Sequence, residues 1–208
     1  MNIIPLIVGS LGTNCYLVES GDQVGIIDPG DDADFIVRKI QDLGAAPAWI
    51  ACTHGHFDHV LAVSELALGF KIPFYLGKKD EFLLQRAKET SEYFLGVSAD
   101  PVLVTPEDLK SGDFLTIGEE ALEVIDTPGH TPGSVSLYSK KDEFLICGDL
   151  VFAHGGVGRT DFKYASEEDL EDSIKKILEL PEETMVYPGH GDEATIRELK
   201  KDLKRVMA

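Results

Sequence analysis

The sequence predicts an α/β fold in which two β-sheets pack together with helices on their outer faces, in a single domain of residues 1–208. Short apolar runs of strand type alternate with segments whose apolar residues recur at helical spacing. Strands followed by helices occur in both halves of the chain, and no low-complexity linker or fixed-period repeat separates the halves. A chain of 208 residues is long enough to bury roughly 70% of its unfolded surface around one core.

The first half begins with three predicted strands, at residues 3–8, 14–19 and 24–28, which are apolar runs closed by Gly, Asn, Asp or Pro. Acidic residues at 31–34 precede apolar residues at helical spacing, and this pattern predicts a helix that Gly44 ends. The remaining segments predict, in order, a strand at 48–53, a helix at 60–68, a strand at 73–76 and a helix at 78–94.

The second half repeats the alternation. Four short apolar runs predict strands at residues 114–117, 122–126, 135–138 and 144–147. Ser166 followed by three acidic residues predicts the start of a helix, with Leu170, Ile174, Ile177 and Leu178 on its buried face. A strand at 185–187 and a helix at 195–207 complete the predicted elements.

Charge and cysteine content restrict the class of protein. The 37 acidic residues outnumber the 19 basic ones, and a net charge of −18 repels phosphate backbones, so no nucleic-acid partner is expected. Cys15, Cys52 and Cys147 are too scattered for a disulfide framework, which indicates a reducing compartment. The chain lacks an apolar run of about eighteen residues, and residues 1–8 lack the basic segment of a signal peptide. We therefore expect a cytoplasmic protein without membrane contact, of unknown oligomeric state.

Three of the six histidines lie within the segment Thr53-His54-Gly55-His56-Phe57-Asp58-His59. The segment follows a predicted strand and precedes a helical pattern, so it forms a loop above a sheet, where functional side chains are usually placed. Its imidazoles and the Asp58 carboxylate converge on a small volume, and zinc prefers such ligands at about 2.0–2.2 Å. A surface loop that happens to be rich in histidine is the alternative interpretation.

Three later turns each place one further potential ligand just after a predicted strand: His130, Asp149 and His190. Glycine and proline frame these turns and can hold the backbone in unusual conformations. A lone histidine in a turn is more often solvated or a helix cap. Four strand ends that all deliver His or Asp, however, predict a shared metal site. His154 lies close to Asp149 and is interpreted as a loop residue.

The pattern His-x-His-x-Asp-His, followed by His, Asp and His at increasing distances, resembles the metallo-β-lactamase superfamily of metallohydrolases. The resemblance extends from residues 14–18 and Ile27-Asp28-Pro29-Gly30 to Tyr187-Pro188-Gly189-His190-Gly191. Residues 129–134 and 158–162 are most similar to the glyoxalase II-like branch, the hydroxyacylglutathione hydrolases. The resemblance implies an αββα sandwich of the metallo-β-lactamase type, with two mixed sheets packed face to face and the site at one edge.

The resemblance also implies a cofactor of two zinc ions, with iron or manganese as alternative metals. The first metal would be bound by His54, His56 and His130, the second by Asp58, His59 and His190, and Asp149 would bridge the two together with a hydroxide. Seven ligands exceed what one tetrahedral zinc uses but suit two metals roughly 3.5–4 Å apart. Such a hydroxide attacks a carbonyl at neutral pH, and Asp58 is the candidate catalytic group that accepts or orients its proton.

The substrate that this chemistry favours is a small acyl-thiol molecule such as S-lactoylglutathione. A thiol has a pKa near about 8.5, so a thiolate leaves without a general acid. Lactone hydrolysis is a lesser alternative. Arg159 is placed like a basic residue of glyoxalase II proteins and is the candidate substrate-binding residue, because its fork of donors suits a carboxylate. The alternative is a structural arginine that holds its loop through Asp161.

Two other functions remain open. A persulfide (sulfur) dioxygenase of the same superfamily would use one iron, bound by His54, His130 and Asp149. The complete second set of Asp58, His59 and His190 favours the hydrolase. A non-catalytic metal-binding module would be expected to have lost a ligand, and the motifs of this sequence keep all seven.

Overall fold

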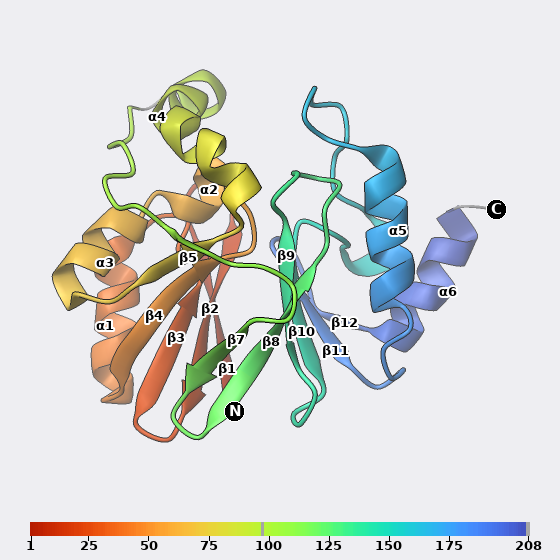
Figure 1. Ribbon diagram of the computed structural model, residues 1–208, viewed down its shortest axis with the longest axis horizontal. Coiled ribbons are helices and arrows are strands. Elements are labelled where there is room, and N and C mark those ends of the chain that lie inside the picture. The colour runs from red at the N-terminus through yellow and green to blue at the C-terminus, as the bar shows by residue number, and fades with distance from the viewer. Residues whose placement is uncertain (97, 207–208) are drawn as a thin grey trace.

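Two six-stranded mixed sheets with helices on their outer faces make up the protein (Figure 1). The structure is a computed structural model that describes residues 1–96 and 98–206. The strands of the first sheet lie side by side in chain order: β1 (Asn2–Val8), β2 (Thr13–Ser20), β3 (Gln23–Ile27), β4 (Ala46–Cys52), β5 (Phe74–Leu76) and β6 (Glu107–Asp108). The pairs β1–β2 and β2–β3 are antiparallel, whereas β3 to β6 run parallel.

The second sheet also follows chain order from one edge to the other: β7 (Phe114–Ile117), β8 (Glu120–Asp126), β9 (Val135–Ser139), β10 (Phe144–Gly148), β11 (Met185–Pro188) and β12 (Ala194–Thr195). The helices are α1 (Ala33–Leu43), α2 (Phe57–Val60), α3 (Val63–Phe70), α4 (Glu81–Leu95), α5 (Glu167–Ile177) and α6 (Ile196–Val206), with 3-10 turns η1 (Lys78–Asp80) and η2 (Ala153–Gly155). Within residues 1–96 and 98–206, no helix is both long and apolar enough to cross a membrane.

Three separate layers of buried side chains hold these elements together. Strand β2 shows how the layers arise, because Cys15 and Leu17 pack toward α1 and α3, while Tyr16 and Val18 pack between the two sheets. Alternate residues of a strand point to opposite faces of its sheet, so one strand contributes to two layers. The third layer lies between the second sheet and helices α5 and α6 (Figure 1). The predicted αββα sandwich is thus confirmed.

Most predicted strands and helices agree with the structure within two or three residues at each end. The helix predicted at 60–68 is instead two helices, because α2 begins inside the histidine motif and ends at Val60 before α3 starts at Val63. The helix predicted at 78–94 begins with the 3-10 turn η1. The two-residue strands β6 and β12 were not predicted. The final helix was predicted to reach Met207, which lies outside the described residues.

Hydrogen bonds connect the two sheets near the end of β4, the start of β9 and the end of β11. The Val135 amide donates to the Thr53 carbonyl at 2.8 Å, which joins the start of β9 to the end of β4. The Asn14 amide donates to the Gly189 carbonyl at 2.8 Å, and the Tyr16 hydroxyl donates to the Pro188 carbonyl at 2.6 Å. These bonds cross between the sheets, so the loops that follow β4, β8, β10 and β11 are held beside one another.

Candidate metal centre

The seven side chains predicted as metal ligands lie together near these strand ends. They come from the segment between β4 and the end of α2, from the β8–β9 loop, and from the residues just after β10 and β11: His54, His56, Asp58, His59, His130, Asp149 and His190. His54 and His59 are fully buried, and His56, Asp58 and Asp149 are half-buried. The strands supply a rigid base, and the loops supply the functional side chains.

The first group consists of His54, His56 and His130. The Nδ1 atom of His56 lies 3.1 Å from His54 Nε2 and 2.9 Å from His130 Nε2. Neighbouring ligand atoms around a tetrahedral zinc lie about 3.3 Å apart when each bond is about 2.0–2.1 Å. The three nitrogens therefore converge with nearly the spacing that a shared cation requires.

The second group consists of Asp58, His59 and His190. Asp58 Oδ2 lies 3.3 Å from His190 Nε2 and 3.7 Å from His59 Nε2. The ring centroids of His54 and His59 are 4.1 Å apart, so the two groups are adjacent. A nitrogen-and-oxygen donor set of this kind suits zinc, iron or manganese, and so the metal's identity does not follow from it.

Asp149 lies between the two groups and presents one carboxylate oxygen to each. Its Oδ1 atom is 3.6 Å from His59 Nε2 and 3.8 Å from His190 Nε2, while its Oδ2 atom is 3.6 Å from His130 Nε2. A carboxylate with its oxygens divided in this way can bind two cations at once. The family resemblance implied a bridging role for Asp149, and that role stays a prediction.

Two buried atoms of the cluster need a partner that the protein does not supply. His59 Nε2 and Asp149 Oδ1 have almost no solvent contact and form no hydrogen bond within the described part of the chain. A buried polar group without a partner costs roughly 1–3 kcal/mol. A cation bound between these two atoms would satisfy both, so the residues present fit a metal site.

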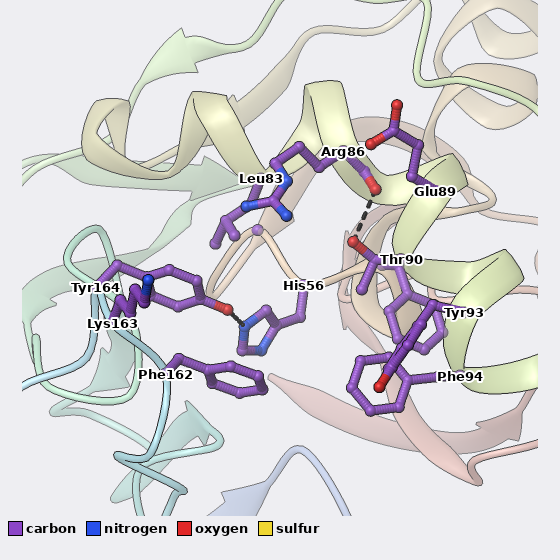
Figure 2. Close-up of a pocket in the computed structure, with 12 residues that line it drawn as sticks. His56, Leu83, Arg86, Glu89, Thr90, Tyr93, Phe94, Phe162, Lys163 and Tyr164 are labelled. Atoms are coloured by element: carbon purple, nitrogen blue, oxygen red, sulfur yellow. Dashed lines mark hydrogen bonds between the residues drawn. The ribbon is translucent and has the colours of Figure 1, made fainter.

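The outer nitrogens of four histidines form hydrogen bonds, which point each inner nitrogen into the cluster, where a bound metal would take the place of any proton. His59 Nδ1–H donates to Asp28 Oδ2 at 3.0 Å, and His130 Nδ1–H donates to the Arg159 carbonyl at 2.8 Å. His54 Nδ1–H donates to the Thr53 hydroxyl at 3.1 Å, because that hydroxyl gives its own proton to Asp28. His56 Nε2 lies 2.8 Å from the Tyr164 hydroxyl, to which it would donate its proton when Nδ1 binds a metal (Figure 2).

Electrostatics also favour bound cations. Burial lowers the pKa of His54 well below its usual range and that of His56 to about 3, and the neighbouring imidazoles contribute to both shifts. Both rings are therefore neutral at pH 7, as metal binding requires. Burial opposes charge on His59 as well, but Asp58, Asp28 and Asp149 outweigh it and raise its pKa to about 10. The carboxylates around the second group thus stabilise positive charge there, which a divalent metal supplies.

Sequence reasoning did not identify Asp28 and Asp80, the two buried carboxylates that position the ligand loops. Asp28 accepts from the Thr53 amide and hydroxyl, both at 2.7 Å, and from His59. Asp80 accepts from the Gly55 amide at 2.9 Å, the Thr131 hydroxyl at 2.6 Å and the Gly133 amide at 2.7 Å. It thereby ties the His54–His56 loop to the loop that carries His130. The Ile27-Asp28-Pro29-Gly30 motif was an available signal for Asp28, whereas Asp80 lies near the start of the helix predicted at 78–94 and belongs to none of the motifs described above.

Glycine is required where the backbone closely approaches the ligands. A Cβ atom at Gly189 would overlap Asp149 Oδ1 and the His59 ring, and one at Gly30 would overlap the Asp58 carbonyl. Turn propensity alone does not explain these two positions. Close packing of backbone against the ligand side chains is the reason that no side chain fits there.

Arg159 borders the centre, but its side chain forms an ion pair. The guanidinium donates to both carboxylate oxygens of Asp161, at 2.9 and 2.7 Å, and lies 4.7 Å from the centre of the Phe162 ring. This pairing is the structural alternative considered from the sequence. Arg159 is still 57% exposed and lines the cavity beside the ligands, so its role in substrate binding stays a prediction.

His154 and the cysteines lie outside the cluster. His154 is exposed on η2 and belongs to neither ligand group. Cys52 and Cys147 are buried in two of the apolar layers, and burial raises the pKa of Cys147 to about 12. These thiols are core residues and are not reactive groups of the site.

An αββα sandwich with histidine and aspartate side chains gathered at one sheet edge defines a class of metal-binding hydrolases. The sequence model of the metallo-β-lactamase superfamily matches residues 8–190, and this chain belongs to that superfamily. It is 40% identical over 193 residues to the probable metallo-hydrolase YqgX of Bacillus subtilis, covering 91% of this chain and 90% of that protein. It is 32% identical over 204 residues to the hydroxyacylglutathione hydrolase GloC of Haemophilus influenzae, covering 97% of this chain and 96% of that protein.

Solved structures show the same fold. The BLEG-1 B3 metallo-β-lactamase matches with a TM-score of 0.91 at 34% identity over the full length of both chains. TTHA1623 in a di-iron-bound form matches with a TM-score of 0.89 at 35% identity, covering 96% of this chain and 98% of that one. ETHE1 from Myxococcus xanthus matches with a TM-score of 0.78 at 27% identity, covering 99% of this chain and 84% of that one. These similarities support the predicted glyoxalase II-like branch of the superfamily.

The hydrogen bond from His56 to Tyr164 makes a testable contribution to the first ligand group. Replacing Tyr164 by phenylalanine keeps the ring, which stacks on Phe162 at 5.3 Å, and removes only the hydroxyl. We expect metal affinity at the first group to fall roughly tenfold, because loss of such an outer partner usually costs about 10–100-fold and Tyr164 is only half-buried. Competition with a chelator measures the affinity.

The matched control for this variant is Tyr93→Phe, which removes a hydroxyl from an 83% exposed ring on α4 that lines a surface groove together with Tyr164. Metal affinity in the control should equal that of the parent protein. Equal affinities in all three proteins would show that the Tyr164 hydroxyl does not orient His56.

Proposed function

We propose that this protein is a binuclear metallohydrolase of the glyoxalase II type that cleaves small acyl-thiol molecules in the cytoplasm, with two zinc ions as its resident metals. The observation that carries the proposal is the division of the Asp149 oxygens between two complete ligand groups. The 32% identity to the hydroxyacylglutathione hydrolase GloC supports a thioester as the substrate. The net charge of −18 argues against nucleic acid, and the odd number of cysteines supports a reducing compartment.

Each ligand side chain has a defined part in this reaction. One metal would be held by His54, His56 and His130. The other metal would be held by Asp58, His59 and His190, and Asp149 would be a ligand of both metals. When bound, two such metals polarise a carbonyl and lower the pKa of water from about 15.7 towards about 7. Asp58 borders the cavity and would accept or orient the proton of the attacking water. Asp28 and the Arg159 carbonyl keep His59 and His130 in the tautomers that bind metal.

A cavity of about 350 Å³ beside the ligands can receive the reacting end of the substrate. It is lined by Leu11, Phe94 and Phe162 as well as by the ligands Asp58 and Asp149. Apolar walls with a few polar groups are typical of small-molecule sites. No general acid is needed for the departing sulfur, since a thiolate leaves with a pKa near about 8.5.

The test is thiol release from S-D-lactoylglutathione by purified, zinc-loaded protein under strictly anaerobic conditions. We expect turnover that depends on metal and is unaffected by the absence of oxygen. A parallel assay with a β-lactam as substrate tests whether the protein has the activity named for the structurally similar BLEG-1 metallo-β-lactamase. Protein that holds two metals per chain and releases no thiol would contradict the thioesterase proposal.

A mononuclear-iron persulfide dioxygenase is the second candidate. The structural similarity to ETHE1 leaves this candidate open, and TTHA1623 in a di-iron-bound form shows that a protein of this fold can hold iron. Its ligands would be His54, His130 and Asp149, all of which belong to the cluster. Oxygen consumption by iron-loaded protein with glutathione persulfide, together with no anaerobic thioester cleavage, would favour this candidate.

A further inference from the structure

A groove of about 510 Å³ lies between α4 and residues 162–164 and opens directly beside the metal centre (Figure 2). It shares His56, Phe57 and Phe94 with the smaller cavity that contacts the other ligands. The groove and the cavity adjoin, so a molecule whose carbonyl reached the metal centre could place another part in the groove. Volumes of about 300–1,000 Å³ are usual for small-molecule sites.

Aromatic side chains form both walls of the groove. On one wall the rings of Phe57 and Phe94 stack at 6.0 Å, and on the other those of Phe162 and Tyr164 stack at 5.3 Å. Tyr93 is 83% exposed and Phe94 is 48% exposed. Exposed aromatic rings gathered beside a cavity mark a surface that gains free energy when an apolar group covers it.

Two cations lie along this groove in a strongly acidic protein. Arg86 and Lys163 are exposed, and within the described residues neither has a carboxylate within 4.0 Å. Figure 2 shows the Arg86 guanidinium on the Tyr164 side of the groove, whereas the Glu89 carboxylate points away from His56. Arg159 lines the smaller cavity beside the ligands, and its charge is paired with Asp161. The groove thus carries about one net positive charge in a chain of net charge −18.

We propose that this groove binds a carboxylate-bearing arm of the acyl-thiol substrate, with the aromatic walls covering its apolar part and Arg86 and Lys163 binding its carboxylate. The excess charge is small and the surrounding field is negative, so a singly charged carboxylate fits better than a multiply charged phosphate. The class of substrate rests on the proposed function, but binding in the groove does not require cleavage. The carboxylate could belong to the acyl side or to the thiol side of the molecule.

The experiment measures binding of uncleavable thioethers to the metal-loaded protein by calorimetry. S-hexylglutathione carries carboxylates on the thiol side, the thioether of N-acetylcysteamine with 6-bromohexanoate carries one on the acyl side, and S-hexyl-N-acetylcysteamine is neutral. We expect one of the two anionic probes to bind more tightly than the neutral one, with an affinity that falls as salt rises. The tighter of the two anionic probes identifies the side that enters the groove.

The variant is the double substitution Arg86→Gln with Lys163→Gln, and the control is Lys88→Gln on the same helix but outside the groove lining. The double variant should bind the preferred anionic probe roughly three- to tenfold more weakly, as two partly solvated charge contacts predict, and should lose most of the salt dependence. Binding of the neutral probe should not change, and the control should match the parent protein.

The outcomes separate this proposal from the proposed reaction. Equal affinity for neutral and anionic probes, or an unchanged affinity in the double variant, would overturn the role of the groove even if thioesters are cleaved. Charge-dependent binding of a thioether without any thioester cleavage would overturn the reaction and retain the groove as an anion-binding site.

Discussion

His130→Ala should lose one tightly bound metal per chain and nearly all hydrolytic activity. His130 Nε2 is 2.9 Å from His56 Nδ1 and 3.6 Å from Asp149 Oδ2, so its removal leaves the first group with two histidines and a share of Asp149. Losing a ligand should cost more than the roughly 10–100-fold in affinity that loss of an outer partner costs. Metal content after dialysis and the rate of thiol release measure the two effects.

The control for this variant is His154→Ala, which removes an exposed histidine that lies outside both groups. It should keep both metals and the parent rate. His130 lies in the loop between β8 and β9 and not in a strand, so the variant should also stay folded. Two metals per chain and an unchanged rate in His130→Ala would contradict the ligand assignment.

Asp28→Asn should weaken metal binding by the second ligand group, although it removes none of the ligands. Asp28 Oδ1 accepts from the Thr53 amide, and Oδ2 accepts from the Thr53 hydroxyl and from His59 Nδ1. An asparagine with its oxygen at Oδ1 would place an NH₂ against His59 Nδ1 and drive the His59 proton to Nε2, the atom that faces Asp58 and Asp149. The flipped amide would set its NH₂ against the Thr53 N–H.

Either orientation leaves a buried donor without an acceptor, which costs about 1–3 kcal/mol of unfolding free energy. Metal affinity at the second group should fall roughly 10–100-fold, as for other outer partners of metal-binding histidines. Asp28 has a φ of 51°, and asparagine tolerates this region well, so the substitution tests the hydrogen bonds and not the backbone.

Denaturant unfolding of metal-free protein and zinc titration of the folded protein measure these two effects separately. Asp172→Asn provides the comparison, because Asp172 is an exposed carboxylate on α5 paired with Lys175. Its stability should stay within about 0.5 kcal/mol of the parent. Parent-like stability and zinc binding in Asp28→Asn would show that Asp28 does not set the His59 tautomer.

The comparison of the two helices around the histidine motif shows where sequence patterns stop being informative. Apolar spacing predicted one helix at 60–68, but the chain forms a short helix, α2, with Asp58 and His59 in it, followed by α3. Local periodicity cannot specify this break, because the start of α2 depends on His56, whose extended backbone is set by the turn after β4. The edge strands β6 and β12 were missed for a similar reason, since two residues carry no periodic signal.

The sequence by itself predicted two packed sheets with outer helices from the alternation of strand and helix patterns, and its His and Asp motifs predicted the superfamily and the candidate metal ligands by their resemblance to that family. Only the tertiary structure decided how the centre is held: the split of Asp149 between two groups, the carboxylates of Asp28 and Asp80, and the Tyr164 hydroxyl on His56. Asp80 acts on loops 25 and 53 residues away, and Tyr164 on a histidine 108 residues away. Contacts between such distant residues leave no local pattern, and they exist only once the two sheets have packed.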